Sequence, residues 1–234
     1  MGKLGVVVVA AGKGTRMRTA ESKQYLVIEG KTILAHTLET FQHLPEVDEI
    51  VIVSGQGEEE RCWDDVRRHD ITKVSRVVSG GKERQHSVYN GLLALSADVD
   101  DVLVHDAVRP FVEPEHILAC WRKAGEAGAA VLAVPVKDTI KVVGEAGIIT
   151  STPDRRSLWA IQTPQAFRLS ALLRAHREAE AAGFIGTDDA MLVERSGMQV
   201  SVVEGSYDNI KITTPEDLPL AEWLLHKRRG ARST

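Results

Sequence analysis

The segment GVVVVAAGKGTRM, residues 5–17, is the most informative part of this chain of 234 residues. Its first half is a continuous run of β-branched residues, which is typical of a strand buried on both faces of a parallel sheet. Its second half is a loop of small residues that includes Gly12 and Gly14. Backbone N–H groups in such a loop can approach a phosphate closely. The stretch therefore predicts a phosphate-binding loop at the end of a buried strand.

Working outward from this strand, short β-branched runs recur with helical patterns between them. The runs predict strands at 49–54, 73–78, 101–105, 129–134 and 199–203. The helical patterns lie at 33–42, 57–69, 83–96, 114–127, 169–182, 188–196 and 215–226. This alternation predicts an α/β fold with a Rossmann-like, mainly parallel twisted sheet and helices on both faces.

One segment breaks the alternation. Two runs of period two, 136–143 and 148–152, flank a turn bounded by Gly144 and Gly147, and they predict a β-hairpin. An isolated two-stranded ribbon is marginally stable in water, so a projecting hairpin needs a partner surface. We therefore predict a single domain over residues 1–234 with a β-arm at 136–157, which either folds back over its own sheet or meets a second subunit and serves dimerisation.

Composition and charge exclude several classes of protein. The chain has 29 Lys and Arg against 33 Asp and Glu, a net charge of −4, which argues against a nucleic-acid surface. Cys62 and Cys120 lack metal or redox spacing, which favours a reduced cytoplasmic compartment. The apolar run at 6–11 is too short for a signal peptide, and no stretch approaches the ~20 apolar residues of a membrane span. We expect a cytoplasmic protein that binds neither nucleic acid nor membrane.

Two familiar nucleotide-binding motifs fit poorly. Met17 stands where the dinucleotide fingerprint needs its third glycine. The sequence Gly30-Lys31-Thr32 has the end of a P-loop, but Tyr25 occupies the place of its first glycine, so we interpret this segment as a turn. The glycine loop therefore predicts neither a dinucleotide-dependent oxidoreductase nor a P-loop protein.

Basic and acidic residues follow the predicted strands at the edge where open parallel sheets bind ligands. Arg16 and Lys23 follow the first loop, and Lys211 is a third candidate cation. They are either solvated side chains or the fixed cations that nucleotidyl transfer needs. Asp106 directly follows the strand predicted at 101–105. It is either a magnesium ligand or the cap of the turn before Pro110. His105 points to the opposite face, which indicates a packed histidine.

Eight blocks of sequence resemble, in order and spacing, the 2-C-methyl-D-erythritol 4-phosphate cytidylyltransferase family. The blocks are Ala10-Ala11-Gly12-x-Gly14-x-Arg16-Met17 with Lys23-Gln24-Tyr25, Gly80-Gly81 with Glu83-Arg84 and Ser87, His105-Asp106-Ala107-x-Arg109-Pro110, Asp138-Thr139, Leu158-Trp159, Thr163-Pro164-Gln165, Thr187-Asp188 and Asp208-Asn209-Ile210-Lys211. The resemblance extends over almost the whole chain.

The resemblance implies a reaction in which methylerythritol phosphate attacks the α-phosphorus of CTP, with Mg²⁺ as cofactor, and pyrophosphate leaves. It assigns Arg16, Lys23 and Lys211 to catalysis, and Asp106 to the metal. The implied CTP-binding residues are Ala10, Ala11, Gly12, Gly14, Gly81, Ser87 and Ala107. The implied substrate-binding residues are Arg109, Thr139, Arg155 and Thr187, of which Thr139 and Arg155 arrive on the arm of the partner subunit in a homodimer.

The chain departs from the family pattern in two places. Lys82 follows Gly81 where an acidic or small polar residue is expected, and Arg156 competes with Arg155 for one role. Thr187 also has a structural interpretation, as the N-cap of the helix beginning at 188. Two alternative functions are a ribitol-5-phosphate cytidylyltransferase and a non-catalytic nucleotide-binding domain. The loop Ala10-Ala11-Gly12 favours the methylerythritol phosphate enzymes, because the ribitol phosphate enzymes tend towards Ala-Gly-Gly.

Overall fold

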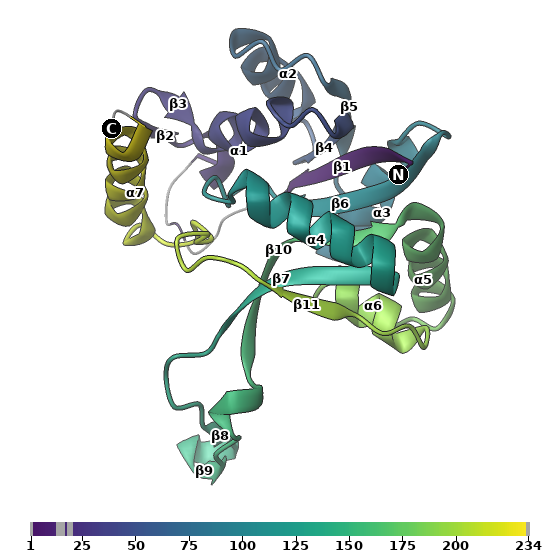
Figure 1. Ribbon diagram of the computed structural model, residues 1–234, viewed down its shortest axis with the longest axis vertical. Helices are drawn as coiled ribbons and strands as arrows, with labels where there is room; N and C mark the ends of the chain where they lie inside the picture. The colour runs from purple at the N-terminus through teal and green to yellow at the C-terminus, as the bar shows by residue number, and fades with distance from the viewer. Residues whose placement is uncertain (1, 13–16, 18–20, 233–234) are drawn as a thin grey trace.

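A seven-stranded sheet forms the centre of the computed structural model, which describes residues 2–12, 17 and 21–232 (Figure 1). The strand order is β11-β7-β10-β6-β1-β4-β5. The strands are β1 (Lys3–Ala10), β4 (Val47–Ser54), β5 (Val74–Ser79), β6 (Val99–Asp106), β7 (Ala129–Pro135), β10 (Trp159–Arg168) and β11 (Ser201–Glu204). All run parallel except β10, which is antiparallel to both of its neighbours. The predicted mainly parallel sheet is confirmed.

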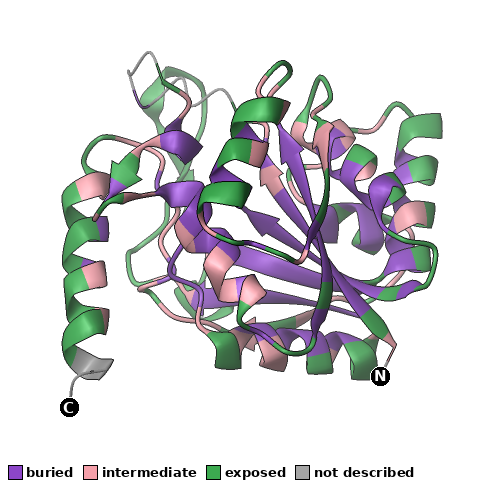
Figure 2. Cartoon of the chain, turned by 90° about the horizontal axis from the view of Figure 1, so that it is seen from above, coloured by how far each residue is buried: buried purple, intermediate pink, exposed green. Residues whose placement is uncertain are grey.

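Side chains that alternate along β1 divide the core into two layers. Val6 and Val8 pack in one cluster with side chains of α1 (Ile33–Gln42), α2 (Glu59–Arg68) and α4 (Pro114–Ala127). Val7 faces the other layer, with α3 (Arg84–Ala94), α5 (Leu169–Ala181) and α6 (Asp189–Arg195). Figure 2 shows the buried strands between helices whose outer faces are exposed. The helices therefore cover both faces of the sheet, as predicted.

A third cluster anchors the segment that follows the glycine loop. Met17 is 1% exposed and packs with Ile33, Phe111 and Ile212. The last helix, α7 (Asp217–Arg232), contributes Ala221 and other side chains to this cluster. Met17 thus fills a core position, which explains why a glycine does not stand there.

The predicted turn at Gly30 is a hairpin turn. It joins β2 (Val27–Ile28) to β3 (Lys31–Thr32), with positive φ at Glu29 and Gly30. The hydroxyl of Thr32 then caps α1 by accepting a hydrogen bond from the backbone N–H of Ala35 at 3.0 Å. The interpretation of this segment as a turn is confirmed.

Several elements begin or end within a few residues of the predicted bounds, and two differences have a clear physical reason. The last helix begins at Asp217, not at 215, because the Asp217 carboxylate accepts hydrogen bonds from the N–H groups of Thr213 and Thr214 at 2.7 and 2.8 Å. Strand β10 is absent from the strands that the sequence predicts. Its middle carries Gln162, Thr163 and Gln165, which are buried but polar. The segment therefore lacks the run of apolar residues that predicts a buried strand.

The arm projects from the carboxyl edge of the sheet (Figure 1). Its root is closed by a hydrogen bond of 3.0 Å from the N–H of Val136 to the carbonyl of Leu158. Only its tip pairs, as β8 (Val142–Val143) and β9 (Ile149–Ser151), so the ladder is shorter than the predicted hairpin. Between the root and the tip the described chain forms no strand pairs; residues 138–141 and 154–157 are exposed, and Arg155–Ser157 form a single 3₁₀ turn.

None of the helices among the residues placed in the structure combines the length and the apolar character that crossing a membrane requires.

Candidate active site

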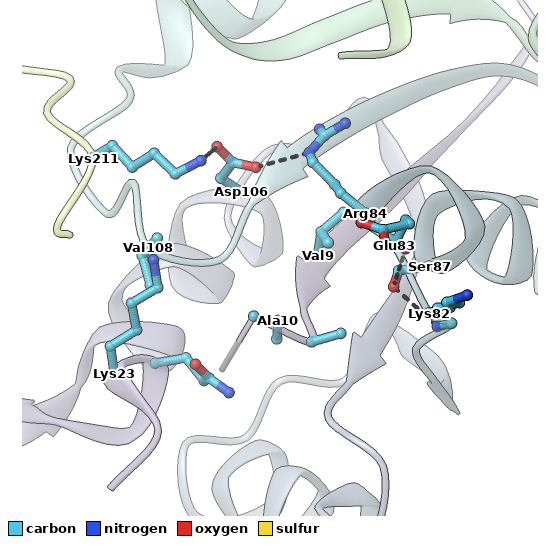
Figure 3. Close-up of a pocket in the computed structure, with 14 residues that line it drawn as sticks. Val9, Ala10, Lys23, Lys82, Glu83, Arg84, Ser87, Asp106, Val108 and Lys211 are labelled. Carbon is cyan, nitrogen blue, oxygen red and sulfur yellow. Dashed lines mark hydrogen bonds and ion pairs between the residues drawn. The ribbon is translucent and has the colours of Figure 1, made fainter. Parts of the chain in front are cut away.

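A cavity of about 310 Å³ opens where the parallel strands end (Figure 3). Its walls come from the loop after β1, the loop after β5, the last residue of β6 and the loop that carries Lys211. The lining residues are Val9, Ala10, Ala11, Gly12, Lys23, Gln24, Gly81, Lys82, Glu83, Arg84, Ser87, Asp106, Val108 and Lys211. A second hollow of about 690 Å³ adjoins the cavity and shares four of these residues. The space is within the range of small-molecule sites.

Two loops approach each other at the floor of the cavity, and small residues make the approach possible. A Cβ atom on Gly80 would collide with that of Ala11, and one on Gly81 would collide with the side chain of His86. The N–H of Gly81 donates to the Ser87 hydroxyl at 3.0 Å, and that hydroxyl donates to the Glu83 carbonyl at 3.1 Å. The loop after β5 is therefore held in a fixed shape against the loop after β1.

Asp106 is the charged centre of the cavity. Its Oδ2 atom lies 2.8 Å from Nζ of Lys211, and its Oδ1 atom lies 3.6 Å from Nε of Arg84. Burial alone would raise the pKa of Asp106, but Lys211 and Arg84 outweigh burial and hold that pKa well below its ordinary value. Asp106 is consequently an ionised carboxylate, and Figure 3 shows it between Lys211 and Arg84.

His105 points away from the cavity, as its position in the strand predicts. It is fully buried, with its ring edge on Phe41. Its Nε2 atom lies 3.1 Å from the Arg109 carbonyl, and its Nδ1 atom lies 3.1 Å from the Thr163 hydroxyl. Burial lowers the pKa of His105 to about 4. The interpretation as a packed histidine is confirmed.

Thr163 connects His105 to Asp106. Its hydroxyl accepts a hydrogen bond of 3.0 Å from the backbone N–H of Asp106. The carbonyl of Arg109 can only accept, so Nε2 of His105 carries the proton and Nδ1 accepts from the Thr163 hydroxyl. The backbone of Asp106 is therefore fixed from the antiparallel strand β10.

Lys23 reaches the cavity from a single 3₁₀ turn, Lys23–Tyr25. The residue is 9% exposed. Glu58 holds this turn: its carboxylate accepts from the Ser22 hydroxyl at 2.6 Å and from Nε2 of Gln24 at 3.2 Å. The lysine is thus placed by a buried turn and not by a flexible surface loop.

Asn209 fixes the loop that carries Lys211. It is 1% exposed, and its side-chain amide donates to Gln162 Oε1 at 3.1 Å and to the Thr163 carbonyl at 3.0 Å. The Asn209 carbonyl in turn accepts from Nη1 of Arg109 at 2.8 Å. Burial lowers the pKa of Arg109, and its Nε atom lies 3.6 Å from Asp106. Strand β10 therefore positions both Lys211 and Arg109.

The structure brings most of the predicted residues together. Eight of them line the cavity, namely Ala10, Ala11, Gly12, Lys23, Gly81, Ser87, Asp106 and Lys211. Arg109 lies behind Asp106, and Ala107 is buried with its carbonyl accepting from Thr37 at 2.8 Å. Gly14 and Arg16 lie outside the described residues.

Three predicted residues stand apart from the cavity within one chain. Thr139 and Arg155 are exposed on the arm, where Nη1 of Arg155 donates to the Lys137 carbonyl at 2.6 Å. Thr187 is exposed and does not cap α6; Asp188 does, by accepting from the N–H of Met191 at 2.9 Å. The structural interpretation of Thr187 as an N-cap is therefore wrong.

Sequence reasoning assigns no role to Arg84, which lines the cavity and contacts Asp106. The available signal is its position at the start of a helix directly after a glycine turn. Glu83, another lining residue, has its carboxylate engaged in a capping box with the N–H of His86. Asp106 is therefore the lining carboxylate that no helix cap uses.

The carboxylate of Asp106 fits a metal ion that a bound substrate helps to hold. Across residues 2–12, 17 and 21–232, no group of three or more His, Cys, Asp and Glu side chains is arranged to bind a metal. Mg²⁺ commonly binds through one or two carboxylates together with substrate phosphates. The ionised Asp106 supplies one carboxylate, so these residues fit a magnesium ion that is completed by a bound nucleotide.

A glycine-bounded cavity at the carboxyl edge of a mostly parallel sheet, with lysines on its walls, places the chain among the nucleotide-binding α/β proteins. A sequence profile of the 2-C-methyl-D-erythritol 4-phosphate cytidylyltransferases matches residues 4–227. The chain belongs to this family.

Individual relatives agree with the profile. The chain is 52% identical to the 2-C-methyl-D-erythritol 4-phosphate cytidylyltransferase of Geotalea uraniireducens, over 98% of this chain and 100% of the relative. It is 50% identical to the protein of the same name from Alkaliphilus metalliredigens, over 97% and 95%.

Solved structures extend the agreement to the fold. The 4-diphosphocytidyl-2C-methyl-D-erythritol synthase of Anaerococcus prevotii matches with a TM-score of 0.85 at 34% identity, over 96% of each chain. The 2-C-methyl-D-erythritol 4-phosphate cytidylyltransferase of Thermus thermophilus matches with a TM-score of 0.78 at 33% identity, over 95% of this chain and 98% of that one. The predicted fold class and the predicted family are both confirmed.

Proposed function

We propose that the protein transfers CMP from CTP to 2-C-methyl-D-erythritol 4-phosphate in isoprenoid precursor synthesis. A phosphate oxygen of the acceptor attacks the α-phosphorus, the bond to the bridging oxygen of the β-phosphate breaks, and pyrophosphate leaves. The observation that carries the proposal is the ionised Asp106 held between Lys211 and Arg84 beside a glycine loop, in a chain of this family.

In this proposal the cavity binds CTP. The loops containing Ala10, Ala11, Gly12 and Gly14 wrap the nucleotide, while Gly81 and Ser87 meet the cytosine and Ala107 lies by the nucleotide. Lys23, Arg16 and Lys211 stabilise negative charge that grows on the α-phosphate in the transition state. The burial of Lys23 and the fixed loop of Lys211 support these roles, because preorganised cations need no rearrangement during the reaction.

Asp106 would hold Mg²⁺ together with phosphate oxygens of CTP. When bound, the ion neutralises phosphate charge and orients the triphosphate. The protein's own contribution is to keep Asp106 ionised and aimed: the N–H of Asp106 is fixed by Thr163, and the two carboxylate oxygens face different cations.

Methylerythritol phosphate is held by Arg109 and Thr187 of one subunit and by Thr139 and Arg155 of the partner subunit. This arrangement requires a homodimer in which the arms are exchanged. Two observations support it: Thr139 and Arg155 are not among the residues that line the cavity of their own chain, and the arm exposes Val143, Ile148 and Ile149 by 55%, 67% and 56%. Covering those side chains would remove apolar surface from water. We place the enzyme in the cytoplasm, where its two cysteines stay reduced.

Pyrophosphate release from CTP with each candidate acceptor tests the function. We expect methylerythritol phosphate to support turnover and ribitol 5-phosphate to support little. The product is identified by mass as the cytidine diphosphate ester. Preference for ribitol 5-phosphate would select the alternative enzyme, and CTP binding without turnover would select the non-catalytic alternative. Omission of Mg²⁺ in the same assay tests the metal.

A further inference from the structure

Arg84 is shared between two carboxylates. It is the first residue of α3, and its Nη1 atom lies 2.7 Å from Oδ2 of Asp189, whereas its Nε atom lies 3.6 Å from Oδ1 of Asp106. Burial acts to lower the pKa of Arg84, but Asp189 and Asp106 outweigh burial and the pKa is raised. The short contact therefore goes to the carboxylate outside the cavity, and the longer contact goes to the one inside it.

Asp189 is itself buried and held by a second group. Its side chain is 1% exposed, and its Oδ1 atom lies 3.3 Å from Nε2 of His176, whose side chain is 2% exposed. Among the described residues, neither of these two facing atoms makes an aligned hydrogen bond, so the contact between them is a close approach of a ring nitrogen to a carboxylate oxygen. The ring of His176 is fixed by stacking on Tyr89, at 5.7 Å between ring centroids.

The protonation of this pair follows from its surroundings. Burial alone would raise the pKa of Asp189, but Arg84 and His176 outweigh burial and hold that pKa below its ordinary value. A lone pair on Nε2 of His176 would face the ionised carboxylate at 3.3 Å, which is unfavourable, so Nε2 carries a proton. His176 thus presents its N–H towards one oxygen of Asp189, while Arg84 donates a hydrogen bond to the other.

Gln165 fixes the segment that carries Asp189. Its Oε1 atom accepts from the N–H groups of Asp189 and Ala190 at 3.2 and 3.1 Å. Its Nε2 atom donates to Asp188 at 2.8 Å. The position of Asp189 is thereby set by a buried side chain of β10, the strand that also fixes Asp106.

We infer that Asp189 and His176 are positioning residues for the cytidylyl transfer: Asp189 holds the guanidinium of Arg84 back from Asp106, and His176 holds Asp189. Without the charge of Asp189, Arg84 would close onto Asp106 and compete with Lys211 and with the metal for its oxygens. The expected loss of kcat rests on the proposed function. The expected movement of Arg84 towards Asp106 does not.

Asp189→Asn is the first test, and the chain offers a matched control. Asp101 is 5% exposed at the far end of β6, with Nη1 of Arg168 at 2.8 Å and Nε1 of Trp121 at 2.9 Å, so Asp101→Asn breaks a similar buried pair away from the cavity. We expect both variants to lower the midpoint of thermal unfolding. We expect only Asp189→Asn to lower kcat, by about tenfold or more, since small misplacements of reacting groups are costly. The KM for CTP should rise as well, because Arg84 on Asp106 would compete with the metal ion that binds together with CTP.

His176→Leu and His176→Gln separate positioning from packing, and they serve if Asp189→Asn does not fold. Both lose the stack on Tyr89, but only Gln can donate a hydrogen bond to Asp189. We expect Leu to lower kcat and Gln to restore most of it. Equal kcat values in these two variants would show that His176 acts through packing alone.

Crystal structures of the variants test the geometry without any assay of activity. We expect the separation of Arg84 Nε and Asp106 Oδ1, 3.6 Å in the unaltered chain, to shorten to a direct hydrogen bond in Asp189→Asn and His176→Leu. It should stay unchanged in His176→Gln and Asp101→Asn. An unmoved Arg84, or an equal loss of kcat in Asp101→Asn, would overturn the inference. Absence of turnover in the unaltered protein would instead overturn the proposed function and leave the crystallographic comparison decisive.

Discussion

Nζ of Lys211 lies 2.8 Å from Oδ2 of Asp106, across the mouth of the cavity. The two side chains differ in exposure, 38% for Lys211 and 9% for Asp106. The aspartate is held by burial and the lysine by its fixed loop, so the more exposed Nζ of Lys211 already lies where a phosphate would enter the cavity. In the resting protein each neutralises the other.

We predict that Lys211→Met lowers kcat by about 10²-fold, the usual loss when one preorganised electrostatic partner is removed. Lys227→Met is the control, because Lys227 pairs with Asp208 at a similar distance, 2.6 Å, on the exposed side of the same region. Steady-state pyrophosphate release measures both. A higher KM with an unchanged kcat for Lys211→Met would show that the lysine binds the ground state only.

Lys23→Ala and Arg16→Ala are expected to reduce turnover far more than CTP affinity. Both cations are proposed to act on charge that grows only in the transition state, so their loss should cost about 10²-fold or more in kcat. Calorimetric titration with CTP gives the affinity, and single-turnover kinetics give the rate. The assigned role would be wrong for either residue whose variant kept its single-turnover rate.

CTP should be preferred over UTP. The backbone around Gly81 is proposed to meet the edge of the base, where cytosine has a 4-amino donor and uracil a 4-oxo acceptor. A mismatched buried polar group costs about 1–3 kcal/mol, which corresponds to a preference of about 5- to 150-fold. Competition between the two nucleotides in one reaction measures the ratio of kcat/KM. Equal use of UTP would contradict the cytosine assignment.

The exchanged arm predicts complementation between two inactive proteins. Lys23→Ala disables the cavity, and Arg155→Ala disables the arm. If the arm serves the partner subunit, a mixed dimer has one site with both lesions and one with neither. Random exchange of equal amounts should then restore roughly a quarter of the unaltered activity. Arg156→Ala is the control for Arg155, because Arg156 pairs with Asp154 at 2.6 Å on the arm itself. No recovery after verified exchange would mean that the arm serves its own subunit.

His36 predicts a loss of stability on mild acidification. Burial lowers its pKa below the ordinary 6.5, even though Nε2 donates to the Ile28 carbonyl at 2.9 Å. The unfolded chain therefore takes up this proton first, so the stabilisation is present above pH 6.5 and is lost as the pH falls through the folded-state pKa. His36→Gln can keep the donor but does not titrate. Urea unfolding between about pH 7.5 and 5 should show the unaltered protein losing stability relative to His36→Gln. A constant difference would contradict the shift.

Much of the fold was predictable because its signals are local. The helices at 33–42 and 114–127 have the predicted bounds, since a capping Thr32 and a Pro114 at the first helical position mark where they begin. Strand β10 carries no such local signal. Its buried Gln162 and Gln165 are satisfied by Asn209, Asp188 and Ala190, which are distant in the sequence. A strand stabilised by remote polar partners does not show a hydrophobic period.

The residues of the candidate site likewise fall into those that the sequence predicts and those that it does not. Gly12, Lys23 and Asp106 stand in motifs at the ends of predicted strands, and the structure places them around one cavity. Asp189 and His176 stand in helices with no motif, and only the packing of α5 against α6 brings them behind Arg84. Their contribution depends on distances between elements, which spacing along a chain does not encode.

The closed root of the arm makes the arm a separable module. Pro135 and Trp159 are paired neighbours in the sheet, so the chain leaves the body and re-enters it at adjacent points. Insertions whose ends lie close together can be shortened or exchanged with little disturbance to the fold that carries them. A tight turn could therefore replace residues 137–157, and the arms of two relatives could be interchanged. The arm's proposed share of acceptor recognition, through Thr139 and Arg155, could in this way be engineered on one continuous segment of some twenty residues, while the nucleotide cavity stays untouched.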